Sequence, residues 1–236
     1  MKKAVLFLCL TMCFFSCSNE NVTQPEDQAC DNGTFVGQVI LKNQQEVDDF
    51  GAMCYSKIDG SLVIGNIFGA TDDIVDLSPL SNMNQVFASN SNDNPGWLRI
   101  KANNLTSLNG LQNITSVNGL MIYNCNKLVD LSGLDALENI GGNPNDFQTL
   151  DIHSNAELVN LEGLNKLSSI GLSGYISYIR FGDNPKLLNL DALSALNEIN
   201  SEFYFETVLD HSTEDIRGND VLSDFCGVQG LFNSGN

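Results

Sequence analysis

The sequence predicts a mainly β protein with short helical segments, in which successive coils stack into a solenoid with a parallel sheet. Two observations predict it. The first is that one pattern recurs along the chain. The second is the order within each copy, which runs from a short alternating strand through a turn into a stretch with an apolar residue at every third position. A single coil of this kind cannot bury its apolar side alone, so the core is expected to form between stacked coils. The copies start at Leu62, Leu98, Leu120, Leu150, Ile179 and Asp215.

The strand of each copy reads apolar–x–apolar, and its third residue is an apolar anchor. Successive side chains of a strand point to opposite faces. The anchors are therefore expected in the core, and the residues beside them on the outer face of one sheet. Neighbouring anchors are roughly 22 to 36 positions apart, which is typical of solenoid coils. The anchors are Ile64, Ile100, Ile122, Ile152, Phe181 and Ile216.

When the copies are written under one another, the turn after each strand shows a column of similar residues, three positions beyond the anchor. An Asn amide at this place can satisfy the backbone of its own turn and of the neighbouring coil, which predicts an asparagine ladder through the stack. Cys125 stands in this column in one copy and is expected to be a buried member of the ladder, not a catalytic nucleophile. The asparagines of the column are Asn103, Asn155, Asn184 and Asn219.

The stretch with period three, such as that from Leu131 to Ile140, predicts short 3₁₀ or single-turn helical segments. In the first copy, Ser78 is a candidate N-cap and Pro79 follows at the first helical position. A column of small polar residues precedes these segments and is interpreted as turn capping, with a metal or acid–base site as the alternative. The column holds Asp76, Ser107, Asp130, Asn160, Asn189 and Asp224.

Residues 1–16 have the organisation of a signal peptide, because two lysines precede the apolar run 4–15. The following Ser16-Cys17 resembles a bacterial lipobox, which implies cleavage before Cys17 and acylation of its thiol. An ordinary signal peptide cut elsewhere and an uncleaved anchor are the alternatives. Residues 17–29 are polar and aperiodic, and are expected to be a flexible tether. We therefore expect a cell-envelope protein that is lipid-anchored to the outer membrane.

Residues 30–60 are expected to cap the N-terminal end of the repeat domain, which covers 30–236. The residues from 35 to 41 predict a strand. Asn43 is a candidate N-cap of a helix that continues through Met53, with Glu46 at the capping-box position.

Four cysteines follow the tether. An exported chain meets oxidising conditions, so disulfides are permitted. Cys30 and Cys54 bracket the short segment at the start of the domain and are expected to pair. Cys125 and Cys226 belong to different repeats, and the simplest interpretation of each is a free thiol.

Several segments of the sequence carry a resemblance to one family: Cys30, Val47-Asp48-Asp49-Phe50, Cys54, 58–64, 76–80, 131–134 and 224–227. With the repeat pattern, they resemble the receptor L domain family, a right-handed leucine-rich-repeat-like solenoid. The resemblance covers 30–236 and implies binding of proteins or glycans, and similar domains occur in envelope lipoproteins of the Bacteroidetes type. Two features depart from the pattern: Ile67 stands in the first ladder position, and residues 201–213 are an insertion that the repeat does not explain.

The composition argues against several classes of function. With 29 acidic and 11 basic residues the formal net charge is −18, whereas phosphate backbones require clustered cations, so no nucleic-acid partner is expected. His153 and His211 are the only histidines, and neither has the spacing of a metal site. No catalytic motif occurs. We expect no enzymatic activity, no metal and no cofactor; a hydrolase and calcium-bound turns are the alternatives.

The strand residues beside the anchors are the candidate ligand-binding residues. All three arginines and the only tryptophan fall among them, although the chain is strongly acidic. Such side chains often dominate binding interfaces, which predicts a protein or carbohydrate ligand on this face. The alternatives are a plain solvated sheet, a site on the loops 89–96 or 141–146, and a structural or adhesive surface protein without a discrete ligand. The candidates are Trp97, Arg99, Lys101, Tyr123, His153, Tyr178, Arg180 and Arg217.

Overall fold

The computed structural model describes residues 31–67, 69, 72–89, 95–142, 148–171, 176–199, 202–207, 219 and 222–229, hereafter the described residues. The predicted signal peptide, Cys17, the tether and Cys30 lie outside them, as do His211 and Arg217. Among the described residues, no helix is both long and apolar enough to span a membrane.

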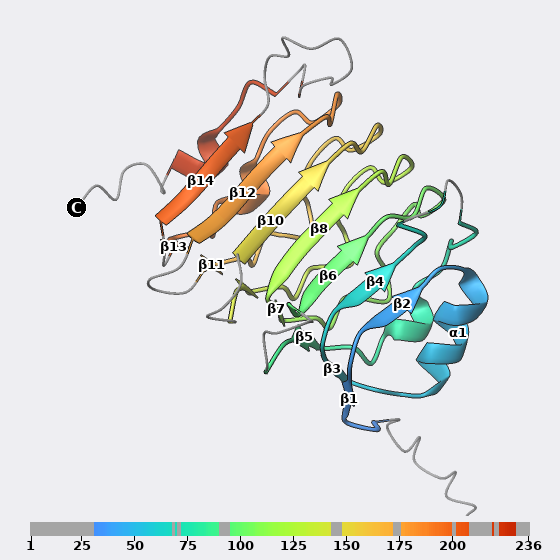
Figure 1. Ribbon diagram of the computed structural model, residues 1–236. Helices are drawn as coiled ribbons and strands as arrows, with labels where there is room; N and C mark the ends of the chain where they lie inside the picture. The colour runs from blue at the N-terminus through green and yellow to red at the C-terminus, as the bar shows by residue number, and fades with distance from the viewer. Residues whose placement is uncertain are drawn as a thin grey trace, which may run out of the picture.

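Two seven-stranded parallel sheets form opposite walls of a stack of coils (Figure 1). Consecutive strands alternate between the sheets, so each coil gives one strand to each wall. Sheet A holds β1 (Thr34–Val36), β3 (Lys57–Asp59), β5 (Gln85–Phe87), β7 (Ser116–Val117), β9 (Asn139–Ile140), β11 (Ser169–Ile170) and β13 (Glu198–Ile199). Sheet B holds β2 (Val39–Leu41), β4 (Leu62–Ile64), β6 (Trp97–Ile100), β8 (Gly119–Tyr123), β10 (Gln148–His153), β12 (Ile176–Gly182) and β14 (Glu202–Thr207). The predicted solenoid is confirmed, but the sequence predicted only sheet B.

The predicted anchors are in register across sheet B. Ile64 lies opposite Ile100, which lies opposite Ile122. Ile122 in turn lies opposite Ile152, and Ile152 opposite Phe181. All five side chains are fully buried in one continuous core, so the coils share their aliphatic interior as expected.

The last strand of sheet B corrects the sequence-based assignment. β14 pairs with β12, and Phe205 lies opposite Ile179. β14 falls within 201–213, which the repeat pattern treats as an insertion. The reason is that backbone pairing needs an extended segment with β-forming residues, which 203–205 supply without the aliphatic pattern of the other copies. The strand expected around Ile216 lies outside the described residues.

The N-terminal segment also differs from the prediction. The residues expected to form one strand form two, β1 and β2, one in each sheet, with Gly37 between them at a left-handed φ of 127°. The predicted helix is present as α1 (Gln44–Ala52). Asn43 caps it by accepting the Glu46 N–H at 2.9 Å, and Glu46 accepts the Lys42 N–H at 2.6 Å.

An aromatic cluster lies beneath α1 at this end of the stack. The ring centroids of Phe35, Phe50 and Tyr55 are 5.4 to 5.9 Å apart. Val47 and Phe50 of α1 are buried. The helix therefore covers the apolar end that the first coils would otherwise expose to water.

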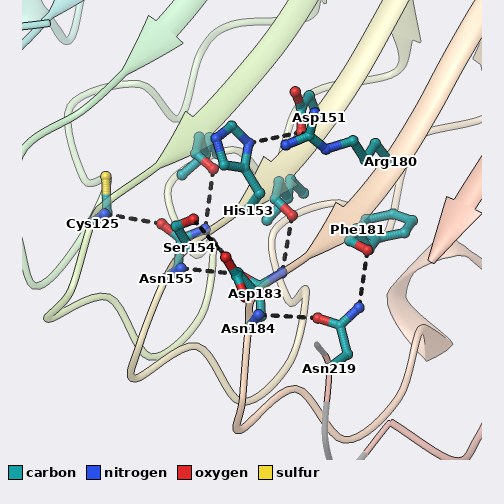
Figure 2. Close-up of polar contacts among 12 residues, drawn as sticks. Cys125, Asp151, His153, Ser154, Asn155, Arg180, Phe181, Asp183, Asn184 and Asn219 are labelled. Atoms are coloured by element: carbon teal, nitrogen blue, oxygen red, sulfur yellow. Dashed lines mark hydrogen bonds and ion pairs between the residues drawn. The ribbon is translucent and has the colours of Figure 1, made fainter. Parts of the chain in front are cut away.

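An asparagine ladder runs through the turns that follow sheet B (Figure 2). Oδ1 of Asn155 accepts the Cys125 N–H at 3.0 Å, and Oδ1 of Asn184 accepts the Asn155 N–H at 3.1 Å. Oδ1 of Asn219 accepts the Asn184 N–H at 3.1 Å. Each asparagine NH₂ also donates to the anchor carbonyl of the preceding coil, at 3.1, 2.9 and 3.0 Å. The ladder prediction is confirmed for these coils.

Asn103 is not a member of the ladder, contrary to the prediction. The Cys125 sulfur accepts the N–H of the fully buried Ala102 at 3.5 Å instead. In the later coils, the residue before the ladder position has a left-handed backbone, whereas no residue between Ile100 and Ala102 does. The ladder position of this coil therefore comes one residue earlier. The left-handed residues are Asn124 (φ 54°), Ser154 (φ 58°) and Asp183 (φ 54°).

The period of three is a run of hydrogen bonds from residue i+3 to residue i. The Leu134 N–H donates to the Leu131 carbonyl at 3.1 Å, and the Leu137 N–H donates to the Leu134 carbonyl at 2.9 Å. In three coils the first turn of this run is a 3₁₀ helix, and in three others it contains a glycine with positive φ. The helices are η1 (Ser78–Leu80), η2 (Asp191–Leu193) and η3 (Cys226–Val228). The glycines are Gly110 (φ 118°), Gly133 (φ 109°) and Gly163 (φ 107°).

The small polar column caps these turns as predicted. Each side-chain oxygen accepts the backbone N–H two residues later, at 2.8 to 3.2 Å. Ser78 corrects one detail, because it is the first residue of η1 and Asp76 caps it. Since these oxygens already accept backbone donors, the column serves the fold.

Candidate ligand-binding face

The register of sheet B places the candidate side chains in three rows across neighbouring strands. The first row holds Trp97, Gly119, Thr149 and Tyr178. The second row holds Arg99, Met121, Asp151 and Arg180. The third row holds Tyr123 and His153. Because residues of one row differ from the buried anchors by one position, the rows lie on the outer face of sheet B.

Trp97 and Arg99 form a cluster on β6. The Arg99 guanidinium carbon is 4.4 Å from the Trp97 ring centroid, within the range of a cation–π contact. The indole lies over Gly119 of β8, where a Cβ would be 2.8 Å from its Cδ1. Glycine at this position thus lets the ring lie against the sheet. The indole Nε1 is buried and has no hydrogen-bond acceptor among the described residues.

Asp151 joins the side chains of β10 and β12 (Figure 2). Its Oδ1 is 2.9 Å from Nδ1 of His153 and 3.5 Å from Nε of Arg180. The Asp151 side chain is 9% exposed, whereas that of Arg180 is 43% exposed. The carboxylate is therefore held inside the face, and the arginine that it orients extends toward solvent.

Tyr123 extends this network to β8. Its ring stacks on the His153 ring at a centroid distance of 5.1 Å and an interplanar angle of 10°. Burial raises the pKa of the Tyr123 phenol, although the nearby charge of Arg99 opposes the shift. Tyr123, His153, Asp151 and Arg180 thus form a continuous chain of contacts across three neighbouring strands.

Lys101 contacts the loop that follows β4. Its ammonium donates to the carbonyl oxygens of Asn66 and Gly69, both at 3.2 Å, and of Ile67 at 3.4 Å. The side chain therefore holds the loop after β4. Tyr178 is 40% exposed, the most exposed aromatic ring of the candidate set. The ligand contacts of the set stay a prediction, and Arg217 lies outside the described residues.

Three residues of the face were missed by the sequence analysis. Gly119 and Thr149 lie between Trp97 and Tyr178 and are small, so they attract no notice in a sequence. Asp183 follows β12, and its Oδ1 is buried without a hydrogen-bond donor among the described residues. The signal for Asp183 was its position directly before the ladder residue Asn184, where the backbone is left-handed.

The unpaired polar atoms gather on this side of the molecule. Among the described residues, the buried side-chain atoms without a hydrogen-bond partner include Nε1 of Trp97, Nε of Arg180 and Oδ1 of Asp183. Buried polar atoms normally find partners, because leaving them unpaired costs free energy. All three belong to strands of sheet B or to the turn that follows one of them.

Two kinds of group bear on chemistry among the described residues, the residue types that bind metals and the free thiols. They contain no group of three or more His, Cys, Asp or Glu residues arranged to hold a metal ion. Burial raises the pKa of the Cys125 thiol to about 12, so it is protonated at neutral pH and is a poor nucleophile. Cys226 is a free, exposed thiol whose pKa is raised by its hydrogen bond and proximity to Asp224.

A stack of parallel coils with a preorganised outer face defines a solenoid binding domain of the leucine-rich-repeat-like class. The family model for the receptor L domain matches residues 53–200. The chain therefore belongs to the receptor L domain family, whose domains are receptor-like, ligand-binding and generally non-enzymatic. Neither a curated protein nor a solved structure matches the chain in the other two comparisons.

Proposed function

We propose that this chain is a cell-envelope lipoprotein of the Bacteroidetes type that binds a protein or a glycan on the outer face of sheet B. The observation that carries the proposal is the coincidence of the candidate residues with the unpaired polar atoms. Trp97 belongs to both sets, and so does Arg180, whose Nε makes no hydrogen bond to any described residue and lies 3.5 Å from the Asp151 carboxylate. A ligand that supplied partners to these atoms would recover free energy that the isolated domain forgoes.

The contacts among the side chains support the same interpretation. Arg99 is held over Trp97, and Arg180 is held by Asp151. Side chains that are already fixed lose little conformational entropy when a ligand binds. The face is therefore preorganised, unlike a solvated sheet whose long side chains move independently.

Attachment to the envelope is the second part of the proposal. The apolar run and Ser16-Cys17 support export and acylation of Cys17, which would place residues 30–236 at the outer membrane. A single lipid chain gives modest membrane affinity, whereas two or more chains on one cysteine anchor stably. Mass spectrometry of the mature N-terminus tests it, and Cys17→Ala should move the protein from the membrane to the soluble fraction. A mature chain that begins elsewhere would contradict acylation.

A disulfide between Cys30 and Cys54 would fasten the N-terminal cap. Cys125 and Cys226 are free, and Cys54 is not among the free thiols. Asn32, two residues from Cys30, donates its N–H to the Cys54 carbonyl at 2.8 Å, which keeps the two segments close. Peptide mapping with and without reductant tests the pairing, and a free Cys30 would contradict it.

The ligand proposal is tested by removing binding side chains of the face while keeping the fold. The mature chain is used in a glycan array and in a pull-down from envelope extract, next to the triple variant Trp97→Ala, Arg99→Ala, Arg180→Ala. Binding should fall by about 100-fold or more, because central Trp and Arg residues dominate interfaces. The control variant Lys186→Ala removes an exposed cation that pairs with Glu157 outside the strands of sheet B and should bind normally. A folded triple variant that binds as well as the native chain would remove the proposal.

A further inference from the structure

We infer that Arg180 binds a carboxylate group, that the ligand of the sheet B face is an acidic carbohydrate, and that Asp151 positions Arg180 for it. The inference rests on the proposed function, because it names the class of ligand for the same face.

The first step is the geometry of Arg180. A guanidinium carries five N–H donors in a rigid plane. The Asp151 carboxylate lies at the Nε side, at 3.5 Å. Within the described part of the chain, the two terminal nitrogens make no hydrogen bond, and the side chain is 43% exposed. They form the fork that pairs with a carboxylate through two parallel hydrogen bonds.

The second step is the support behind Arg180. His153 contacts the same Asp151 oxygen at 2.9 Å, and Tyr123 stacks on His153. The same Asp151 oxygen thus contacts His153, which fixes the carboxylate, and Arg180, which the carboxylate orients.

The third step is the match to a carbohydrate. Each of four neighbouring strands carries one ring on the face: Trp97, Tyr123, His153 and Tyr178. Trp97 and Tyr178 stand in the first row, with the small residues Gly119 and Thr149 between them. Two flat rings in one row across the strands offer apolar faces to the rings of a sugar chain. The unpaired atoms include a donor, Trp97 Nε1, and an acceptor, Asp183 Oδ1, and a sugar hydroxyl can serve either.

The fourth step is the sign of the charge. All three arginines of a chain with net charge −18 are in the candidate set. Arg99 and Arg180 stand in one row, with Met121 and Asp151 between them. Two arginines in one row of an acidic protein favour recognition of an anion at short range, because charge complementarity across an interface gives specificity. Uronic acids combine a pyranose ring with a carboxylate and satisfy both requirements.

The experiment is calorimetric titration of the full mature chain at about 0.15 M salt, where the Debye length is about 8 Å. The probes are an oligomer of galacturonic acid and the same oligomer with its carboxylates methyl-esterified. The acid should bind about tenfold or more tightly than the ester, a difference of about 1.4 kcal/mol. Equal binding of the two would overturn the carboxylate assignment.

Three variants assign the contact. Arg180→Gln should weaken binding of the acid more than binding of the ester, so that the preference for the acid is lost, and Arg180→Lys should retain part of this preference. Asp151→Asn should also reduce the preference for the acid, whereas a merely structural role would weaken binding of both probes equally. Thermal unfolding of each variant checks the fold.

The outcomes separate the inference from the proposed function. If neither probe binds, but a captured protein is lost in the triple variant, the inference fails and the proposed function stands. If Arg180→Gln binds the acid like the native chain, the assignment to Arg180 fails. If the triple variant binds every probe normally, the proposed function fails as well.

Discussion

The outer faces of the two sheets differ in what their polar side chains contact. On the sheet A side, small polar side chains hydrogen-bond to the neighbouring coil, to its backbone or, for Ser169 and Asn139, to its side chain. Thr115 Oγ1 donates to the Asn84 carbonyl at 3.3 Å, and Ser168 Oγ donates to the Glu138 carbonyl at 3.2 Å. On sheet B, Asp151, His153 and Arg180 contact one another instead.

The difference lies in surplus hydrogen-bonding capacity. Small hydroxyl and amide side chains on the sheet A side already hydrogen-bond to the neighbouring coil, so their donors are not available to a ligand. The long side chains on sheet B extend beyond the backbone, and three buried polar atoms on that side remain unpaired among the described residues. One face therefore reinforces the stack, whereas the other retains donors and acceptors for a partner.

The largest effect on stability should come from the ladder, which aligns the strands of sheet B without belonging to its outer face. Asn155→Ala leaves the Cys125 N–H and the Ile122 carbonyl without their partner, so the free energy of unfolding should fall by about 3 kcal/mol. Urea denaturation measures it. Asn126→Ala removes an exposed Asn–Asn hydrogen bond and should cause no measurable change. An equal loss in both variants would show that the ladder is not what aligns the sheet.

The turn glycines should come next. Gly163 has a φ of 107°, and a Cβ there would collide with the carbonyl oxygen of Leu131 in the preceding coil. Gly163→Ala should therefore cost about 2 kcal/mol or more. Gly33→Ala is the matched control, because Gly33 has a φ of 73° but nothing within 4 Å of the added carbon. It should lose only the cost of the left-handed backbone, about 1 kcal/mol. Equal melting temperatures for the two variants would exclude close coil packing as the cause.

The comparison of the two faces can be tested directly. The double variant Thr115→Val, Ser168→Ala removes two hydroxyl contacts of the sheet A side and should cost about 1 kcal/mol of stability without changing ligand binding. Arg180→Gln on sheet B should cost about 0.5 kcal/mol or less, because its ion pair is partly exposed and screened, yet should weaken binding. Chemical denaturation and titration of both variants give the two quantities. If the sheet A variant lost ligand binding and Arg180→Gln lost only stability, the comparison of the two faces would be wrong.

The smallest effect at neutral pH concerns the two free thiols. At pH 8, a thiol reagent should modify exposed Cys226 in the folded protein, whereas buried Cys125 should react only after unfolding. The pKa of Cys125 is raised from 9.0 to about 12. Its contribution to stability is therefore complete below pH 9 and is lost as the pH rises toward 12. Cys125→Ala should flatten the decline of stability across this window. Rapid labelling of Cys125 in the folded chain would contradict its burial.

The sequence by itself determined the coil. Recurrent spacing specified the buried anchors, the ladder from Cys125 to Asn219, the capped turns of period three and α1, because each depends on residues a few positions apart. It also placed Trp97, Arg99, His153 and Arg180 on one outer face, since alternation along a strand fixes the side on which a residue lies.

Only the tertiary structure decided how the coils meet. It revealed the second sheet, moved the ladder position from Asn103 to Ala102, made β14 the last strand and directed the Lys101 ammonium to the loop after β4. It also showed which polar atoms stay unpaired. The physical reason is that these features depend on the register and contacts between coils some 30 positions apart, which packing of the shared core fixes and no local pattern encodes.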